Sequence, residues 1–418
     1  MPVRLAITNS VTLDGGDAAI VLSMAGSLRR ELGPDTEIKV LCHSVEAARR
    51  LYGRELDLLP VPEEAHRFAG RSKLSRKLLS ETFIPRSALG WLTPEERRVA
   101  EVFQWADAVV SCGGGFLTDR YSSGKRLAGL RLALASGTPL VFYAQSVGPF
   151  VRPGKRRAFR RVLERAAAIT VRDAPSLEEV RALGLSAELT ADEVFLFDAP
   201  ELPGLPDLRA GLAPGRPLVA VSVRRWHFPG CPGDPAALRE RYLASVAAAA
   251  ERLVVARQAR VIFLSTCQGV PEYGHDDSGL ATRVTATLPE EVRREVQVDR
   301  AYHHPAELRG LLRQCDAVVA TRMHAAILAM LGGTPALAIG YEAKSAGLYS
   351  RLGLGEWCLD IAGREMENLP EKAVALLDQA AGLRAELPAK VAELAAAARA
   401  NARAVRKVLV ARGVVADA

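Results

Sequence analysis

The stretch Asp316–Tyr341 constrains the fold of this chain more than any other segment. It contains two short apolar runs, Ala317–Ala320 and Ala336–Ile339, separated by a helical pattern over Ala325–Leu331 and a Gly-Gly-Thr-Pro break. Apolar runs of this length that alternate with helices are typical of parallel strands buried on both faces. The stretch therefore predicts a strand–helix–strand unit within an α/β fold that has a doubly wound sheet.

A similar arrangement occurs earlier in the chain. Asp107–Val110 reads Asp-Ala-Val-Val and is followed by Leu132–Pro139, which ends in Gly-Thr-Pro. Asp316–Val319 has the same four residues, and Leu328–Pro335 ends in the same tripeptide. From this repeat we predict two Rossmann-like domains that face a cleft. Chance similarity between generic strand–helix–strand sequences is the alternative explanation.

Length and composition agree with two domains. The chain has 418 residues, of which 49% are hydrophobic and 25% charged, so it is globular but too long for one ordinary core. The Pro- and Gly-rich segment 199–217 is the best candidate for a linker between domains at 1–198 and 218–370. Residues 371–418 are Ala-rich and predict a C-terminal helical segment that is broken at Pro388.

Other patterns predict the remaining elements. Residues 61–98 are polar and basic, with a cluster at Gly70–Leu78 and a tryptophan at Trp91, and we expect them to form an insertion or a mobile segment over the sheet edge. Helices are expected near 18–32, 235–257 and 305–314, and strands near 3–9, 38–42, 108–110, 140–143, 168–171, 187–189, 218–223, 261–264 and 296.

Charge and cysteine content narrow the function classes. The net charge is +7, but the basic residues are spread and aromatic residues make up only 6%, which argues against a nucleic-acid partner. Anionic small molecules or an anionic membrane surface explain the charge instead. The sequence has no apolar run of about 20 residues, and its N-terminal stretch lacks the apolar core of a signal peptide. We therefore expect a cytoplasmic protein, with docking at the inner membrane face as an alternative, and six scattered, reduced cysteines.

Basic residues follow two predicted strands of the second domain. Arg322 and His324 come directly after Ala317–Ala320, and Arg224 and Arg225 follow the strand near 218–223. Guanidinium groups bind carboxylate or phosphate through paired hydrogen bonds, and histidine transfers protons near neutral pH. The pattern predicts a site for a small, doubly anionic ligand and proton transfer. Alternatively, Arg322 caps a surface and His324 satisfies a local hydrogen bond.

The first domain contributes glycines and carboxylates. Gly113, Gly114 and Gly115 allow close backbone approach to a ligand. The turn Asp14–Asp17 is a weak phosphate-loop signal, for which a plain strand-to-helix turn is the favoured interpretation. We expect no metal site, because adjacent histidines such as His303 and His304 point apart on a regular element.

Several motifs together resemble the polysaccharide pyruvyl transferases. They are GGGFLTD, YAQSVGP, VRDAPSLEEVRALG, ADEVF, VSVRRW and TRMHAAILAMLGGTPALAIGYEAK, and the resemblance covers roughly residues 5–360. It implies a GT-B-like architecture of two Rossmann-like domains. Members of the family transfer the enolpyruvyl moiety of phosphoenolpyruvate to a sugar, as a ketal that bridges two hydroxyls. Their acceptors are typically lipid-linked precursors of exopolysaccharides or cell-wall polymers.

The resemblance also implies roles for individual residues. The family's Arg-x-His motif falls on Arg322–His324, and its donor-binding arginine falls on Arg224 beside Arg225. From the chemistry of the reaction we hypothesise that His324 is the acid or acid/base. The donor side would then be the second domain and the acceptor side the first, with no cofactor besides the co-substrate phosphoenolpyruvate. The amino-terminal turn departs from the family's Asn-x-Gly-Asp pattern because Asn9 is separated from Gly16. The candidates for the acceptor-side base are Asp17, Asp119 and Glu342.

Two other functions remain open at this point. A glycosyltransferase with a nucleotide-sugar donor would use the same arginines to hold a diphosphate. A non-catalytic binding module at the membrane face is the third alternative. The basic run of the C-terminal helix, from Arg399 to Arg412, is interpreted as a solvated helix face rather than as a membrane-docking surface.

Overall fold

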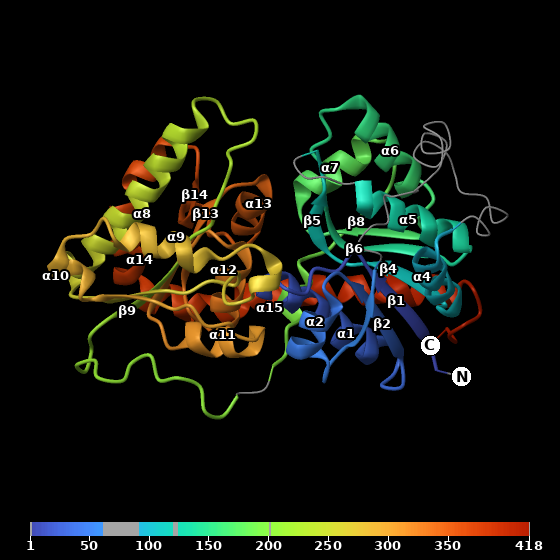
Figure 1. Cartoon of the computed structure of the whole chain (residues 1–418), viewed down its shortest axis with the longest axis horizontal. Coiled ribbons are helices and arrows are strands. Elements are labelled where there is room, and N and C mark those ends of the chain that lie inside the picture. Colours follow the sequence, from blue (N-terminus) through green and yellow to red (C-terminus); the bar gives the residue numbers. More distant parts are fainter. Residues whose placement is uncertain (1, 62–91, 120–123, 200–201, 418) are drawn as a thin grey trace. The chain divides into compact units, whose positions relative to one another are not determined.

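The computed structural model describes residues 2–61, 92–119, 124–199 and 202–417. Most of the expected insertion at 61–98, including the basic cluster Gly70–Leu78 and Trp91, lies outside these residues. The described chain forms two compact units (Figure 1). Unit 1 comprises residues 1–12, 17–198 and 394–418, and unit 2 comprises residues 13–16 and 199–393.

Unit 1 is built on an eight-stranded parallel sheet in the order β3-β2-β1-β4-β6-β7-β8, with β5 paired to β6. The order around β1 and β4 is that of a Rossmann sheet, in which the order of the strands reverses between the first and the fourth strand. The strands are β1 (Arg4–Thr8), β2 (Glu37–Cys42), β3 (Asp57–Pro60), β4 (Ala108–Ser111), β5 (Gly114–Leu117), β6 (Leu140–Val147), β7 (Ala168–Val171) and β8 (Glu188–Leu189). The helices are α1 (Gly15–Leu32), α2 (Val45–Tyr52), α4 (Pro94–Trp105), α5 (Gly124–Ser136), α6 (Pro153–Leu163) and α7 (Ala174–Ala182).

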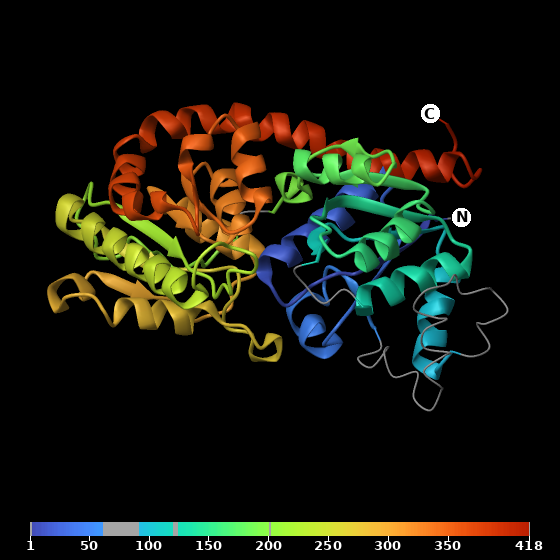
Figure 2. The same ribbon diagram turned by 90° about the horizontal axis from the view of Figure 1, so that it is seen from above.

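Unit 2 has a six-stranded parallel sheet in the order β11-β10-β9-β12-β13-β14, which is again the Rossmann order. Helices lie on both faces of the sheet (Figures 1 and 2). The strands are β9 (Leu218–Ser222), β10 (Arg260–Phe263), β11 (Val296–Val298), β12 (Ala317–Ala320), β13 (Ala336–Gly340) and β14 (Cys358–Asp360). The helices are α8 (Pro235–Arg257), α9 (Asp277–Thr285), α10 (Glu290–Arg293), α11 (Pro305–Arg313), α12 (Met323–Leu331), α13 (Ala343–Arg351) and α14 (Leu369–Asp378). The predicted α/β class and the two Rossmann-like units are thus confirmed.

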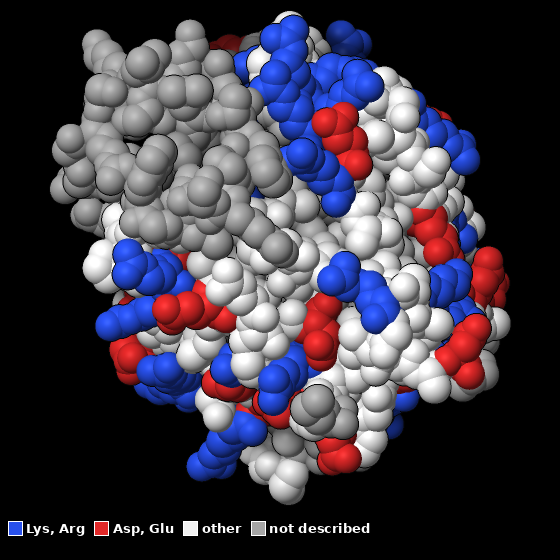
Figure 3. Space-filling model, turned by 90° about the vertical axis from the view of Figure 1, so that its right-hand side faces the viewer, with Lys and Arg blue, Asp and Glu red and all other residues white. Residues whose placement is uncertain are grey.

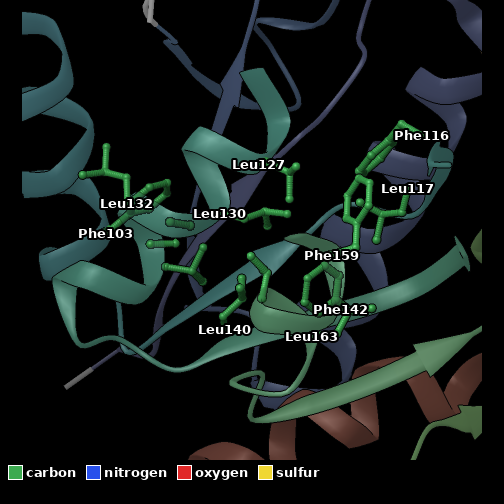
Figure 4. Packing of buried hydrophobic residues seen from close by; sticks show 14 of the residues in the cluster. Phe103, Phe116, Leu117, Leu127, Leu130, Leu132, Leu140, Phe142, Phe159 and Leu163 are labelled. Atoms are coloured by element: carbon green, nitrogen blue, oxygen red, sulfur yellow. The ribbon is translucent and has the colours of Figure 1, made fainter. Parts of the chain in front are cut away.

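The core of unit 1 lies between the sheet and the helices α4, α5 and α6. Figure 4 shows Phe103, Leu130, Phe142, Phe159 and Leu163 converging there, and all five are fully buried. Burying one side chain of this size contributes about 1.5–3 kcal/mol. The inner faces of these helices are therefore committed to the core, and only their outer faces are available for other contacts.

The glycine-rich segment that we expected to be a ligand loop is in part a strand. Gly114 begins β5, and its carbonyl oxygen accepts a hydrogen bond of 2.5 Å from Gln145 Nε2. A Cβ atom at Gly113 would lie 3.1 Å from the carbonyl oxygen of Tyr143. The glycines therefore allow the chain to pack closely against β6. Because glycines carry no alternating apolar pattern, the sequence did not predict a strand here.

The C-terminal segment differs from the expected one. A single helix, α15 (Ala380–Val410), runs through Pro388, and the break falls instead at Gln379 (Figure 2). Pro388 is exposed, so the carbonyl group that loses its helical partner can bond to water. Residues 371–393 belong to unit 2 and residues 394–418 to unit 1, whereas we expected one separate segment. The basic residues Arg399, Arg403 and Lys407 are exposed, in agreement with a solvated helix face.

The expected linker 199–217 packs onto unit 2. Arg209 bonds to Asp316 (Nη2–Oδ2, 2.7 Å) and to the carbonyl oxygen of Gln314 (2.7 Å). Within the described residues, every helix is too short or too polar to span a lipid bilayer.

Candidate active site

Arg322 lies where β12 ends and α12 begins, at the N-cap position of the helix. Its backbone N–H donates to Ser222 Oγ (3.2 Å) at the end of β9, the neighbouring strand. This point between β9 and β12 is where the strand order of unit 2 reverses. Ligands of open α/β sheets bind at this position, at the carboxyl ends of the strands.

The Arg322 side chain is held by two carboxylates. Nε and Nη2 donate to Asp277 (2.7 and 2.9 Å), and Nη1 donates to Asp14 Oδ2 (3.0 Å). Only 11% of the arginine side chain and 4% of the Asp277 side chain are exposed. Burial lowers the pKa of Arg322, but attraction to Asp277 and Asp14 outweighs it and raises the pKa above its ordinary value. The guanidinium group is therefore always charged, and three of its five N–H groups are engaged within unit 2.

Asp14 and the two glycines after it form a tight turn at the start of α1. Asp14 Oδ1 accepts a hydrogen bond from the N–H of Gly16 (2.9 Å), and the N–H of Gly15 donates to the carbonyl oxygen of Thr266 (2.8 Å). A Cβ atom at Gly15 would approach that oxygen to 3.0 Å. The turn is thus fastened both to Arg322 and to the loop after β10.

His324 is the second residue of α12 and is half-buried. Gly16 packs directly against it, since a Cβ atom on Gly16 would lie only 2.7 Å from His324 Cβ and Nδ1. The absence of a side chain at Gly16 therefore determines where the imidazole lies.

Arg224 lies among aromatic rings at the end of β9. Its guanidinium carbon is 4.3 Å from the centroid of the Tyr341 ring and 5.4 Å from that of Trp226, and Nη1 donates to the Tyr341 hydroxyl. Its backbone N–H donates to the Tyr242 hydroxyl (3.0 Å), which also bonds to Thr321 Oγ1 (2.8 Å) at the end of β12. These contacts fix the charge of Arg224 on the same edge of the sheet as Arg322. Arg225, by contrast, is exposed.

Glu342 lies beside this aromatic group in unit 2. It occupies the N-cap position of α13, and its carboxylate forms an ion pair with Lys344 (2.7 Å). Lys344 Nζ is in turn 5.3 Å from the centroid of the Tyr341 ring. Lys344 and Arg224 thus both lie beside the Tyr341 ring, and the charge of Lys344 is paired with Glu342. The sequence patterns did not single out Lys344.

Asp119, a predicted acceptor-side residue, is buried in unit 1. Its Oδ2 accepts a hydrogen bond of 2.5 Å from the backbone N–H of Arg152, the N-cap residue of α6. Its backbone N–H donates to the carbonyl oxygen of Pro149 (3.3 Å). The contacts of Asp119 are therefore those of a residue that holds the start of α6.

Asp17 lies in the first turn of α1, on the side of unit 1 where a buried polar network gathers. Burial opposes the charge of Arg172, but its neighbours Asp192, Asp173 and Asp17 raise its pKa. Arg172 bonds to Asp192 (2.5 Å) and to Ser146 Oγ (2.8 Å), which donates to Asp173 (2.8 Å). Ser146, Arg172, Asp173 and Asp192 belong to the motifs YAQSVGP, VRDAPS and ADEVF. These motifs are the sequence feature from which this network could have been predicted.

Among the described residues, no group of histidine, cysteine and carboxylate side chains is arranged to hold a metal ion. Cys267 lies near Arg322, Asp14 and Asp277, but burial raises the pKa of its thiol, so it is an inert core residue.

Comparisons with known proteins agree with the fold. In the solved structures, similarity extends over the whole chain, but at sequence identities that show the fold alone. S. aureus MnaA with UDP has a TM-score of 0.61 and 11% identity, covering 100% of this chain and 98% of that one. Anabaena Alr3699/HepE with UDP and glucose has a TM-score of 0.58 and 14% identity, covering 99% and 100%.

The sequence comparisons are more specific. The amylovoran biosynthesis protein AmsJ of Erwinia amylovora is 29% identical over 281 residues, which are 65% of this chain and 66% of AmsJ, just under two thirds of that relative. A sequence profile for polysaccharide pyruvyl transferases matches residues 15–343. This range contains Arg224, Asp277, Arg322 and His324, and it begins directly after Asp14. This chain belongs to the polysaccharide pyruvyl transferase family.

Proposed function

We propose that this transferase moves the pyruvyl group of phosphoenolpyruvate onto a sugar of a polysaccharide precursor, where it forms a ketal. The observation that carries the proposal is the position of His324 and the half-buried Arg224 and Arg322 at the strand-reversal point of one Rossmann-like unit. Phosphoenolpyruvate carries a carboxylate and a phosphate, and such a ligand needs more than one cationic partner.

The reaction requires one proton donor and anion-binding groups. A proton is added to C3 of the enol, and a sugar hydroxyl attacks C2 as positive charge develops there. The bond from C2 to the phosphate oxygen breaks and inorganic phosphate leaves. A second hydroxyl of the same sugar then closes the ring, and the two hydroxyl protons balance the equation. In this proposal His324 is the acid at C3.

The arginines have different tasks. Arg224 and Lys344, which flank Tyr341, are the proposed partners of the donor's carboxylate and phosphate. Arg322 has two N–H groups beyond those bound by Asp277 and Asp14, so it offers the donor fewer bonds and orients the start of α12 as well. On the acceptor side, Asp17, Asp119 and Glu342 all stay candidates for the base; Asp119 accepts a hydrogen bond from the N–H of Arg152, and Glu342 pairs with Lys344. We further propose that the acceptor is lipid-linked and is met at a membrane surface.

The test is mass spectrometry of lipid-linked acceptor fractions incubated with the protein and phosphoenolpyruvate. The expected result is a pyruvyl adduct together with an equal amount of released phosphate. His324→Ala should abolish both, whereas the control His275→Ala, at an exposed loop position, should leave them unchanged. Adduct formation at the full rate by His324→Ala would remove His324 from the mechanism.

Donor recognition is tested separately. Arg224→Ala should raise the KM for phosphoenolpyruvate by about tenfold to a hundredfold, because it removes a charged hydrogen-bond partner. A thermal shift with nucleotide sugars but none with phosphoenolpyruvate would favour a glycosyltransferase and overturn the proposal.

A further inference from the structure

The helix α6 of unit 1 presents a dense group of positive charges. Residues 152–165 contain seven basic residues and one acidic residue, so this short stretch carries most of the chain's net charge of +7. Figure 3 views the molecule from the right-hand side of Figure 1, and Lys and Arg side chains gather in the upper part of this view. The exposed basic residues of the group include Arg152, Arg157, Arg160 and Arg161.

The inner face of α6 is already occupied. Phe159, Val162 and Leu163 are buried in the core, so every turn of the helix directs its arginines outward. Glu164 is the one acidic residue within the sequence 152–165. Arg156 pairs with Glu179 (3.4 Å) and Arg160 with Glu164 (3.8 Å), both at long distance.

The positive charges crowd one another at the edge of the group. Arg131 of α5 is half-buried, and burial together with the nearby charge of Arg161 lowers its pKa. A surface that brings like charges this close gains free energy when an anionic partner approaches.

An apolar residue stands directly before the helix. Val151 is 80% exposed, the largest exposure of any large hydrophobic side chain in the described residues. Its loop is fixed on both sides of it, because Asp119 accepts a hydrogen bond from the N–H of Arg152 and donates one to the carbonyl oxygen of Pro149. An exposed aliphatic side chain beside several arginines is suited to contact with a lipid surface. The arginines would contact the headgroups, and Val151 would reach the boundary of the acyl chains.

We propose that α6 and the preceding loop, residues 150–161, form a docking surface for a bilayer that contains anionic lipids. Because the apolar face of α6 lies in the core, the helix stays on the surface and does not insert, and Val151 alone enters the interface. The inference deepens the proposed function in one respect, since it states where a membrane-bound acceptor is met. Vesicle binding, however, is measured without donor or acceptor and does not depend on catalysis.

The experiment is co-sedimentation of the full chain with phosphatidylcholine vesicles that contain either no or about one third phosphatidylglycerol. The variant Arg157→Glu/Arg160→Glu/Arg161→Glu tests the surface. The matched control is Arg399→Glu/Arg403→Glu/Lys407→Glu, which makes the same charge change on exposed positions of α15 in the same unit. Circular dichroism and thermal unfolding confirm that both variants are folded.

The expected result is binding to the anionic vesicles only, weakened by added salt. The α6 variant should lose at least roughly a hundredfold, since each basic residue near such a surface contributes about fivefold and each glutamate adds repulsion. The α15 variant should bind as the parent chain does, and Val151→Ser should show a smaller loss. Equal losses in both triple variants would mean that net charge alone governs binding. That outcome would overturn the proposal. Binding to heparin, a soluble polyanion, without binding to vesicles would also overturn it.

Discussion

At the scale of single residues, Arg322 acts as much through the groups that hold it as through its own charge. A buried arginine costs free energy unless its hydrogen bonds are satisfied, and Asp277 and Asp14 satisfy three of them. These buried ion pairs of Arg322 add little net stability compared with apolar residues of the same volume. Removing one partner, however, leaves a buried charge without compensation.

We therefore expect Asp277→Asn to destabilise the protein by roughly 2–4 kcal/mol, because it removes the bidentate partner of a buried charge. Urea unfolding measures the change. The control is Asp276→Asn, since Asp276 caps α9 through the N–H of Ser278 and asparagine caps a helix equally well. Equal stability of the two variants would show that Asp14 alone suffices to hold Arg322.

Gly16→Ala provides a second test of the site. The new methyl group would lie 2.7 Å from His324 Cβ and Nδ1, so the imidazole must move. We expect kcat to fall by about a hundredfold, because a shift of about 1 Å in a reacting group has that effect.

The control for this substitution lies on the same helix. A Cβ atom at Gly26 of α1 meets only Arg30 Nη1 at 3.6 Å, an ordinary contact, and alanine favours a helix interior by about 0.5–1 kcal/mol. Gly26→Ala should therefore retain its activity and gain stability. A fully active Gly16→Ala variant would mean that the position of His324 does not limit the reaction.

Part of this site could be predicted from the sequence, and part could not. Arg224 and Arg322 each follow an apolar strand, so their common sheet edge follows from the α/β pattern alone. Asp14 lies in a turn and Asp277 is the first residue of α9, so neither has a periodic signal, and they meet Arg322 across 308 and 45 residues. The role of Tyr341 and Lys344 depends on the register of β13, which the sequence does not reveal.

At the scale of elements, the second half of α15 packs into unit 1 with buried apolar residues and one buried asparagine. Asn401 is fully buried, and its oxygen accepts hydrogen bonds from Thr170 and Thr190 (2.7 Å each). Its nitrogen donates to the carbonyl oxygen of Ala191 (3.1 Å) and to Glu193 (3.0 Å). All four hydrogen bonds that an asparagine side chain can make are formed.

We expect Asn401→Ala to loosen this half of the helix, since it leaves several buried polar groups without a partner, at roughly 1–3 kcal/mol for each. Hydrogen exchange of residues 394–410 should become faster, while α14 stays protected. Arg403→Ala, an exposed position on the same helix, is the control. Unchanged exchange in Asn401→Ala would show that apolar contacts such as those of Val405 and Leu409 hold the helix.

The elements themselves were largely predictable, because buried parallel strands and long helices have strong sequence patterns. α8 begins and ends at the expected residues, Pro235 and Arg257, since Asp234 caps it and the proline fits its first turn. Elements that depend on tertiary contacts were missed. β14 has three residues and no apolar alternation of its own, and it exists because it pairs with β13.

At the scale of the whole molecule, the buried carboxyl group of Glu193 should make stability depend on pH. Burial raises its pKa from 4.5 to about 7, although hydrogen bonds from Ser27 and Asn401 offset part of the effect. Between these pH values the folded chain holds a proton that the unfolded chain has lost. Folding is therefore favoured at low pH, and this contribution disappears as the pH rises through about 7.

The expected consequence is a free energy of unfolding that falls by roughly 2–3 kcal/mol between pH 5 and pH 8 on account of this group. Urea unfolding at the two pH values measures it. Glu193→Gln keeps an acceptor for Asn401 without a titrating group, so it should be less pH-dependent and more stable than the parent at pH 8. The same pH dependence in both proteins would assign the effect to other residues.

The chain also passes repeatedly between its two units, because residues 13–16 belong to unit 2 and residues 394–418 to unit 1. Neither unit is therefore a continuous segment of sequence. A domain boundary drawn from composition at 199–217 identifies only one of these crossings, since the others fall inside a turn and inside a helix.

The hydrogen bond between Asp14 and Arg322 has a consequence for biosynthesis. The two residues are 308 positions apart, and at about 5–20 residues per second a ribosome needs roughly 15–60 seconds to make that length of chain. Unit 1 can begin to fold during this time, but the turn at residues 13–16, which belongs to unit 2, has no arginine to bind. The site is therefore among the last parts of the nascent protein to assemble, and a chain that is truncated before residue 322 never acquires it.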